Sequence, residues 1–295
     1  MRVSVQAADY RGGRLTMTRK VISHAFFWIV LIMIAIFTMF PLLWGIACSL
    51  RSDTEIFKYA RPLSYHTFVP VKFSLDSYIR IFRDFKFQRP LLNTFYVSAV
   101  TIIAGCLINS IAAVAFAKFK FKGKKIIFVA ILISFMIPFE SITLPLYSVV
   151  NSFHWVDTYT GLIVPCLADG LVLFLFNQFF KDFPESILEA AEIDGASIPK
   201  IYFKIIMPLS MPVFVTAALM VFMNEWNAYL WPLVIARSPG IRLVQIAIAS
   251  FKMERVTLWS CLYAASIISA LIPVVFFLPF QKYYVQGITS SGIKG

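Results

Sequence analysis

The sequence predicts an all-α integral membrane protein with six transmembrane helices, and its composition and charge spacing carry this prediction. Hydrophobic residues make up 59% of the 295 residues and charged residues only 14%, whereas soluble globular proteins contain about 25% charged residues. Phenylalanine alone occurs 30 times. These values exclude a disordered chain, collagen, a coiled coil and a small disulfide scaffold. Lipid is therefore the expected surrounding of most of the chain.

Six apolar segments are long enough to cross a bilayer as helices. A spanning helix needs about 20 residues, and lipid cannot satisfy free backbone amides, so helices are the economical structure. Three segments contain no charged residue: 21–50, 90–117 and 256–281. Three more contain one acid each: 126–150 with Glu140, 162–180 with Asp169, and 210–236 with Glu225. We expect one spanning helix from each.

The first apolar segment could also be compared with a secretory signal peptide, because Arg19 and Lys20 precede it. Its apolar run is about twice as long as the usual core of such a peptide, and no clean cleavage site follows. We therefore expect a retained transmembrane helix.

The basic residues predict that both termini lie in the cytoplasm. Six crossings place both ends on the same side, and with the termini inside, 15 of the 27 lysines and arginines are cytoplasmic and 12 are outside. The segment 118–125 holds five lysines in eight residues and no acid. Such density beside membrane helices favours the cytoplasmic side.

The sequence contains no recognisable catalytic or metal-binding arrangement. It lacks a phosphate-binding loop of the G-x-x-x-x-G-K-[ST] type, and its three histidines lie in separate segments. The four cysteines have the spacing of neither a metal site nor a disulfide framework. We expect a non-enzyme that binds no cofactor or metal. The scattered basic residues favour contact with lipid headgroups over nucleic acid.

The loop 181–209 between the fourth and fifth segments predicts two short cytoplasmic helices. Pro184 and Glu185 are typical of a helix start, and Gly195 is placed to end that helix in a left-handed conformation. Ser197 begins a second short helix, which Pro208 is expected to close. Glutamates at 185, 189 and 192 form an acidic stripe on the first helix. This loop either docks a partner or only caps the helix bundle.

The same loop resembles the EAA loop of ABC-importer permeases. The matching residues are Glu189-Ala190-Ala191, Gly195 after three intervening residues, Ile205, and Met207-Pro208; Met207 stands where the family usually has leucine. Residues 226–233 (WNAYLWPL) are similar to a run of carbohydrate-uptake permeases. The tail 284–295 (YVQGITSSGIKG) resembles the ending of the maltose-permease (MalG) subfamily.

The resemblance implies a type I ABC importer permease of a bacterial cytoplasmic membrane. Its domains would be a cytoplasmic tail (1–20), a first helix with an extracytoplasmic loop (21–88), a permease core of five helices (89–280) and a cytoplasmic tail (281–295). The implied partners are a second homologous permease subunit in a heterodimer, two ATPase subunits that use ATP and Mg, an extracytoplasmic solute-binding protein, and lipid.

The resemblance also assigns contact residues. Coupling to the ATPase would fall to Glu189, Ala190, Ala191, Asp194 and Gly195, with the glutamate supplying a charge-assisted contact and the alanines permitting close approach. A second ATPase contact would be made by the tail residues Gly292, Ile293, Lys294 and Gly295. From their glycine and serine surroundings alone, these residues would be expected to form only a frayed terminus.

Polar residues inside the apolar segments are candidates for a translocation pathway. Charged groups in a bilayer usually face protein or water, and planar aromatic and amide groups suit sugar faces and hydroxyls. The candidates are Asn224, Glu225, Trp226, Asn227, Tyr229 and Glu140. The alternatives are that these groups hold helices together or form an interfacial belt. The sequence assigns no role to Asp169.

The outer loop 51–89 is too long for a simple turn and carries eight basic residues. It is expected to contact the binding protein or the partner permease, or else to be a plain solvated loop. Its positive charge would also steer an acidic oligosaccharide such as alginate.

Two other functions fit the sequence less well than a sugar-importer permease does. An ion-coupled secondary transporter would use Glu140 and Glu225 as relays and would work without an ATPase, but it leaves the 181–209 loop unexplained. A membrane enzyme acting on lipid-linked sugar would need a catalytic acid pair, metal cluster or phosphate loop, and the sequence shows none of these.

Overall fold

The structure is a computed structural model that describes residues 3–62, 64–252 and 257–292. Within these ranges every regular element is helical, and strand-like pairing is limited to one isolated bridge between Lys252 and Thr257. The predicted all-α fold class is confirmed for the described residues.

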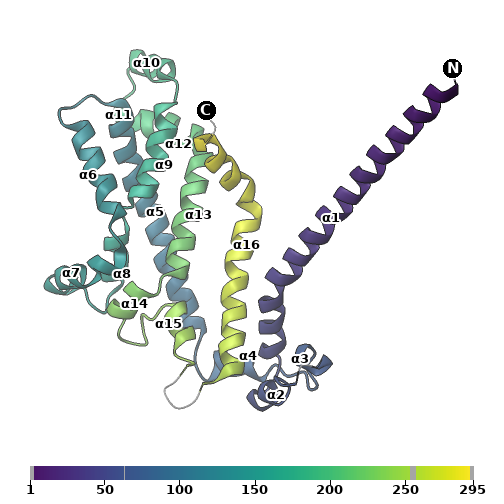
Figure 1. Ribbon diagram of the computed structural model, residues 1–295. Helices are drawn as coiled ribbons and strands as arrows, with labels where there is room; N and C mark the ends of the chain where they lie inside the picture. The colour runs from purple at the N-terminus through teal and green to yellow at the C-terminus, as the bar shows by residue number, and fades with distance from the viewer. Residues whose placement is uncertain (1–2, 63, 253–256, 293–295) are drawn as a thin grey trace.

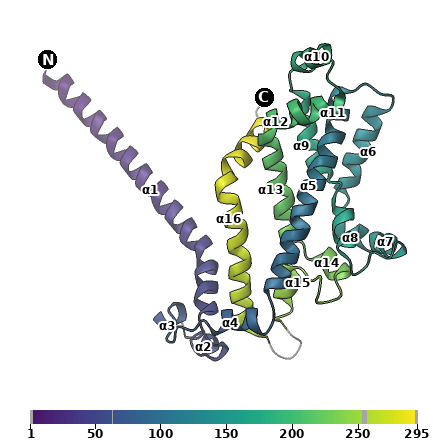
Figure 2. The ribbon, with the colours of Figure 1, turned by 180° about the vertical axis from the view of Figure 1, so that it is seen from behind.

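Long helices run between two ends of the molecule, and one of them, α1, stands apart from the others over most of its length (Figures 1 and 2). The bounds of these helices are α1 (Val3–Ser49), α5 (Gln88–Lys118), α6 (Lys124–Met136), α9 (Gly170–Lys181), α13 (Met211–Asn227) and α16 (Trp259–Gly292).

Short helices gather at the two ends. The start of α1 and the end of α16 lie at the same end of the molecule as α10 (Figure 1), as an even number of crossings requires. That end holds α10 (Glu185–Ile193), α11 (Ile198–Ile201), η2 (Tyr202–Ile206) and α12 (Met207–Leu209). Toward the other end lie α2 (Asp53–Lys58), α3 (Tyr65–Phe68), α4 (Asp76–Arg83), α7 (Phe139–Ser152), α8 (Tyr159–Ile163), η1 (Val164–Cys166), α14 (Leu230–Ile235) and α15 (Val244–Ala249).

The predicted number of six spans agrees with the helices of the described residues. Three helices, α1, α5 and α16, contain stretches long and apolar enough to cross a membrane unaided, and three bent helix pairs raise the number to six when each pair counts as one span. Five of the predicted segments coincide with these candidate spans, while the third bent pair, Ile198–Leu209 with Met211–Asn227, overlaps the predicted segment 210–236 only up to Asn227.

The expectation of one continuous helix per segment was wrong for three segments. The segment 126–150 is α6 and α7, which meet at 103°. The segment 162–180 bends by 42° before α9, and in 210–236 helix α13 ends at Asn227 while α14 begins at Leu230. Prolines explain two of the breaks, because Pro138 immediately precedes α7 and Pro232 lies in the first turn of α14, where a missing N–H costs little.

Helix α1 presents an almost bare apolar surface. It begins at Val3 rather than at the predicted start of the segment, and none of its most apolar 18-residue window is buried within the chain. Packing contacts are seen in its last turns, where Gly45 lies against Ile267 and Tyr263 of α16, and Trp44 makes an edge contact with Phe68 of α3. Lipid or another protein is expected to cover the exposed apolar side chains between Phe26 and Phe37.

Asn109 of α5 satisfies the backbone at the break between η1 and α9. Its Nδ2 donates to the carbonyl of Leu167 at 2.8 Å and to that of Gly105 at 2.7 Å. Its Oδ1 accepts from the backbone N–H of Asp169 at 3.1 Å. The Asn109 side chain is 3% exposed. One buried amide therefore replaces hydrogen bonds that a continuous helix would have made for itself.

Replacing Asn109 with leucine should destabilise the protein by about 1–3 kcal/mol, because the change keeps the volume but leaves partly buried backbone groups of Leu167 and Asp169 without their partner. Thermal unfolding of the purified protein in detergent, followed by tryptophan fluorescence, measures the effect. The matched control is Ile108→Leu at a half-exposed neighbouring position. Equal unfolding temperatures for the two variants would contradict the role given to Asn109.

Candidate functional site

The 181–209 loop folds as a helix, a tight turn and a second helical run. Helix α10 starts after Pro184 and ends at Ile193. Gly195 has a φ of +73°, and the N–H of Ala196 donates to the carbonyl of Ala191 at 3.0 Å, so the left-handed turn predicted for this glycine is confirmed. The second run begins after Ser197, also as predicted.

Pro208 does not close the second run. The helical turns continue through α12 to Leu209, and Pro208 lies in the first turn of α12. A π-helical turn, Tyr202–Ile206, precedes it. Such a wide turn accommodates a proline ring that has no N–H to donate.

Buried contacts attach the loop to the helix bundle. Ile201, Tyr202 and Ile206 pack in one hydrophobic cluster with residues of α5, α9 and α13. The hydroxyl groups of Tyr202 and Ser110 of α5 are 2.6 Å apart. The Lys118 ammonium at the end of α5 donates to the carbonyl of Phe183 at 2.7 Å. The loop is therefore fixed to α5 by packing and by hydrogen bonds.

The predicted coupling residues point in two directions. Glu189, Ala190, Asp194 and Gly195 are exposed, as a docking surface requires. Ala191 is only 7% exposed and belongs to the hydrophobic cluster under the loop. The close approach that Ala191 permits is therefore to the chain's own core.

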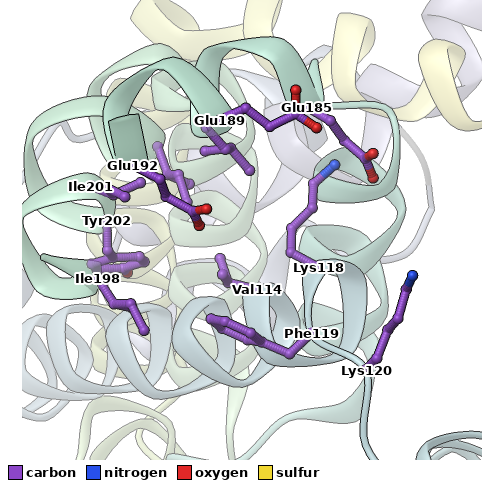
Figure 3. Close-up of a pocket in the computed structure, with 12 residues that line it drawn as sticks. Val114, Lys118, Phe119, Lys120, Glu185, Glu189, Glu192, Ile198, Ile201 and Tyr202 are labelled. Atoms are coloured by element: carbon purple, nitrogen blue, oxygen red, sulfur yellow. The ribbon is translucent and has the colours of Figure 1, made fainter. Parts of the chain in front are cut away.

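A groove of about 270 Å³ lies between α10, the second helical run and the end of α5. Figure 3 shows its mixed lining, with acidic and basic side chains around an apolar floor. The charged lining residues are Lys118, Lys120, Glu185, Glu189 and Glu192. The acidic stripe predicted from the sequence thus forms one side of a hollow, on the end of the molecule that carries α10.

A larger cavity, of about 970 Å³, lies where the three broken segments come together. Each break contributes to its wall: Ile137 and Pro138 from the α6–α7 break, Ala168 and Asp169 from the η1–α9 break, Ala228 and Tyr229 from the α13–α14 break. Non-helical backbone at membrane depth is tolerated where it is buried in protein or lines a water-filled cavity. We call this space the central cavity.

Four of the six predicted pathway residues line the central cavity: Glu140, Asn224, Glu225 and Tyr229. Trp226 is instead 1% exposed and donates from Nε1 to the carbonyl of Ser269 at 3.0 Å, which ties α13 to α16. Asn227 bonds to its own helix through the carbonyl of Met223 at 2.8 Å. We leave these two out of the cavity wall.

The three acids of the cavity have different surroundings. Glu225 is 5% exposed, and the Cys166 thiol is in hydrogen-bonding reach of its carboxyl group. Glu140 is exposed in the first turn of α7. Asp169 caps α9, because its Oδ1 accepts from the N–H groups of Leu171 at 2.8 Å and Val172 at 3.1 Å. Asp169, unassigned in the sequence, therefore starts a helix.

The segment before α8 is joined to the segment after α14. Asp157 donates from its N–H to the carbonyl of Ile235 at 3.0 Å and accepts at Oδ1 from the N–H of Ser238 at 2.8 Å. The hydrogen bonds from Ser238, together with the nearby Arg237 charge, lower the pKa of Asp157. Arg237 also donates to the Tyr147 hydroxyl on α7. These hydrogen bonds therefore favour the ionised form of the Asp157 side chain.

The structure also bears on metal binding and on the C-terminal tail. Among the described residues no group of three histidine, cysteine or acidic side chains is arranged to hold a metal ion. Of the tail residues expected to contact an ATPase, Gly292 ends α16, and residues 293–295 lie outside the described part of the chain.

Comparisons with known proteins agree on one family. Residues 105–290 match the family described as binding-protein-dependent transport system inner membrane component. The arabinooligosaccharides transport system permease protein AraQ of Halalkalibacterium halodurans is 34% identical over 89% of this chain and 93% of its own. The trehalose/maltose transport system permease protein MalG of Thermococcus litoralis is 32% identical over 95% of this chain and 100% of its own.

A solved structure supports the fold. A chain of a bacterial ABC transporter involved in the import of the acidic polysaccharide alginate matches with a TM-score of 0.75, over 87% of this chain and 94% of that chain. Its sequence identity is 20%, so the likeness shows the fold alone.

Substituting Gly195 with valine should cost about 1–2 kcal/mol, because a β-branched residue is strained at a positive φ. Nothing lies within 4 Å of the position that a Cβ would take, so steric overlap contributes little. Gly195→Asn is the matched variant, since asparagine tolerates this conformation better. Thermal unfolding should rank wild type above asparagine and asparagine above valine; a valine variant as stable as wild type would contradict the analysis.

Proposed function

We propose that this chain, which belongs to the family of binding-protein-dependent transport system inner membrane components, carries a sugar or oligosaccharide into a bacterial cell by alternating access. As a member of this family it is a multi-pass inner-membrane permease of an ABC importer, and it works with ATPase and solute-binding partners. Relatives named for arabinooligosaccharides and for trehalose or maltose support a carbohydrate as cargo.

The central cavity supports a translocation role. Three predicted spanning segments interrupt their helices at its wall, and in other transporters discontinuous helices near the bilayer midplane form the substrate site. We place Glu140, Asn224, Glu225 and Tyr229 along this path. Carboxylates, an amide and a phenol offer acceptors and donors for sugar hydroxyls, and aromatic lining offers flat apolar faces.

The driving force would enter through the 181–209 loop. A ligand or partner shifts a two-state scaffold only if it binds one state more tightly than the other. We propose that two ATPase subunits supply this bias, with ATP and Mg bound in them and no cofactor in this chain. Glu189, Ala190, Asp194 and Gly195 would contact the ATPase, and Ala191 would hold α10 onto the bundle.

The rest of the assembly follows from the same proposal. A second, homologous permease subunit would complete the path as a heterodimer and, with lipid, would cover α1. A solute-binding protein would dock outside, near the loop 51–89. Both termini would be cytoplasmic, since the start of α1 and the end of α16 lie at the end that carries α10. The tail 292–295 would then reach the ATPase subunits, and nucleic acid would have no part.

The ion-coupled alternative is not favoured. It requires transport by this chain with no nucleotide-hydrolysing partner, whereas the family is defined by dependence on a binding protein. Solute accumulation by the chain reconstituted alone would revive it.

Reversing the charge of Glu189 should uncouple the importer. Glu189→Lys replaces a proposed charge-assisted contact by repulsion, and we expect sugar-stimulated ATP hydrolysis and uptake to fall about tenfold or more. The measurement is ATPase activity and uptake in proteoliposomes that contain the complete complex.

The control is Lys122→Glu, an equal charge reversal at an exposed residue of the 118–125 segment that does not line the groove beside α10. It should leave coupling intact, and both variants should insert normally. Normal uptake by Glu189→Lys would remove the coupling role from this residue.

A further inference from the structure

We infer that the central cavity selects a saccharide that carries no negative charge, and that Glu140 and Glu225 determine this selectivity. The inference deepens the proposed function and rests on it. It concerns the cargo of the path rather than the existence of the path, so the two can be tested separately.

The charges of the cavity wall have one sign. Among the described residues that line it, the charged ones are Glu140, Asp169 and Glu225, and none is a lysine, arginine or histidine. The Asp169 carboxylate already accepts two backbone N–H bonds at the start of α9. The two glutamates are therefore left to act on a bound molecule.

A carboxylate on the cargo would be repelled in this space. Two like charges repel each other more strongly at the effective dielectric of a protein site than in water. Glu140 is exposed at the cavity wall, so its carboxyl group faces a bound molecule directly, whereas Glu225 is 5% exposed and lies within reach of the Cys166 thiol. A sugar with several uronate groups would meet this repulsion at each group that passes the wall.

An uncharged saccharide fits the same wall. Its hydroxyl groups can donate hydrogen bonds to the carboxyl oxygens of Glu140 and Glu225. An ionised carboxylate only accepts hydrogen bonds, so a sugar hydroxyl is a suitable partner. The aromatic rings of Phe135, Phe139 and Trp231 also line the cavity and offer apolar faces for the C–H surface of a sugar ring. At about 970 Å³, the space lies at the upper end of ordinary ligand pockets.

The basic outer loop does not argue for an acidic cargo once its contacts are known. Arg51 is 1% exposed and donates to the carbonyl of Thr67. Arg83 is paired with Asp84 at 2.8 Å, and Arg89 donates to the carbonyl of Gly240 at 3.0 Å. Three of the eight basic residues in this loop thus hold its local structure, which weakens the expectation that the loop steers alginate.

The test compares matched neutral and acidic sugars on the same complex. The complete importer without its solute-binding protein is placed in lipid nanodiscs, so that the binding protein's own preference does not enter. The probes are maltotriose, arabinotriose, and each sugar with its primary hydroxyls oxidised to carboxylates. Saturation-transfer NMR titrations give the dissociation constants.

We expect the wild type to bind the acidic form at least about tenfold more weakly than the neutral form. The double variant Glu140→Gln, Glu225→Gln keeps the shape and removes the charges, and it should bring the ratio of the two affinities close to one. Asp84→Asn, which removes an exposed charge outside the cavity, should leave the ratio as in the wild type. Retained affinity for the neutral sugar shows that the double variant is folded.

Equal binding of neutral and acidic sugar by the wild type would overturn the selectivity and leave the path standing. So would a ratio that the double variant does not change. If neither neutral sugar binds a complex that still assembles and hydrolyses ATP, the central cavity is not the sugar path, and the proposed path falls together with the inference.

Discussion

Backbone hydrogen bonding in a bilayer is the constraint on which this structure depends. An N–H or C=O group that faces hydrocarbon without a partner costs several kcal/mol, so a spanning segment can leave the helix only where protein or water takes over its bonds. Three predicted spanning segments of this chain leave the helix, at the α6–α7, η1–α9 and α13–α14 breaks, and all three breaks reach the wall of one cavity. The cavity gives the backbone at these breaks a place where protein or water can satisfy it.

Side chains from elsewhere in the fold supply the missing bonds. Asn109 serves the break before α9 from the neighbouring helix, and Asp169 caps the helix that follows it. Trp231, just after the α13–α14 break, donates from Nε1 to the carbonyl of Gly161 at 3.1 Å. Gly161 cannot gain a side chain without overlap, because a Cβ there would lie 2.2 Å from the carbonyl oxygen of Trp155. These contacts make the cavity wall a defined structure.

Helix starts and turns that depend on neighbouring residues could be predicted from the sequence. Contacts between segments that are far apart in the sequence could not. The helix start at Pro184 and the turn at Gly195 follow from a missing N–H and a missing side chain, so they could be predicted. Long apolar runs revealed the spanning segments but not whether each one forms an unbroken helix. Prolines, and hydrogen-bonding side chains from other segments, decide where the helices break. Asn224 and Trp226 are two residues apart on α13 and face different surroundings; helical spacing could have separated them. No local signal ties Asp169 to Asn109, sixty residues away.

One helix connects the two candidate sites. Ser110 of α5 bonds to Tyr202 in the 181–209 loop, and the adjacent Asn109 bonds to the break at the cavity wall. Adjacent residues of an α-helix keep a fixed separation, because the hydrogen-bonded ladder resists local stretching. A displacement of the loop that moves α5 as a rigid body must therefore also move the backbone at Leu167 and Asp169. The geometry needs no long relay of side chains, since two adjacent residues join Tyr202 of the 181–209 loop to the backbone at the cavity wall.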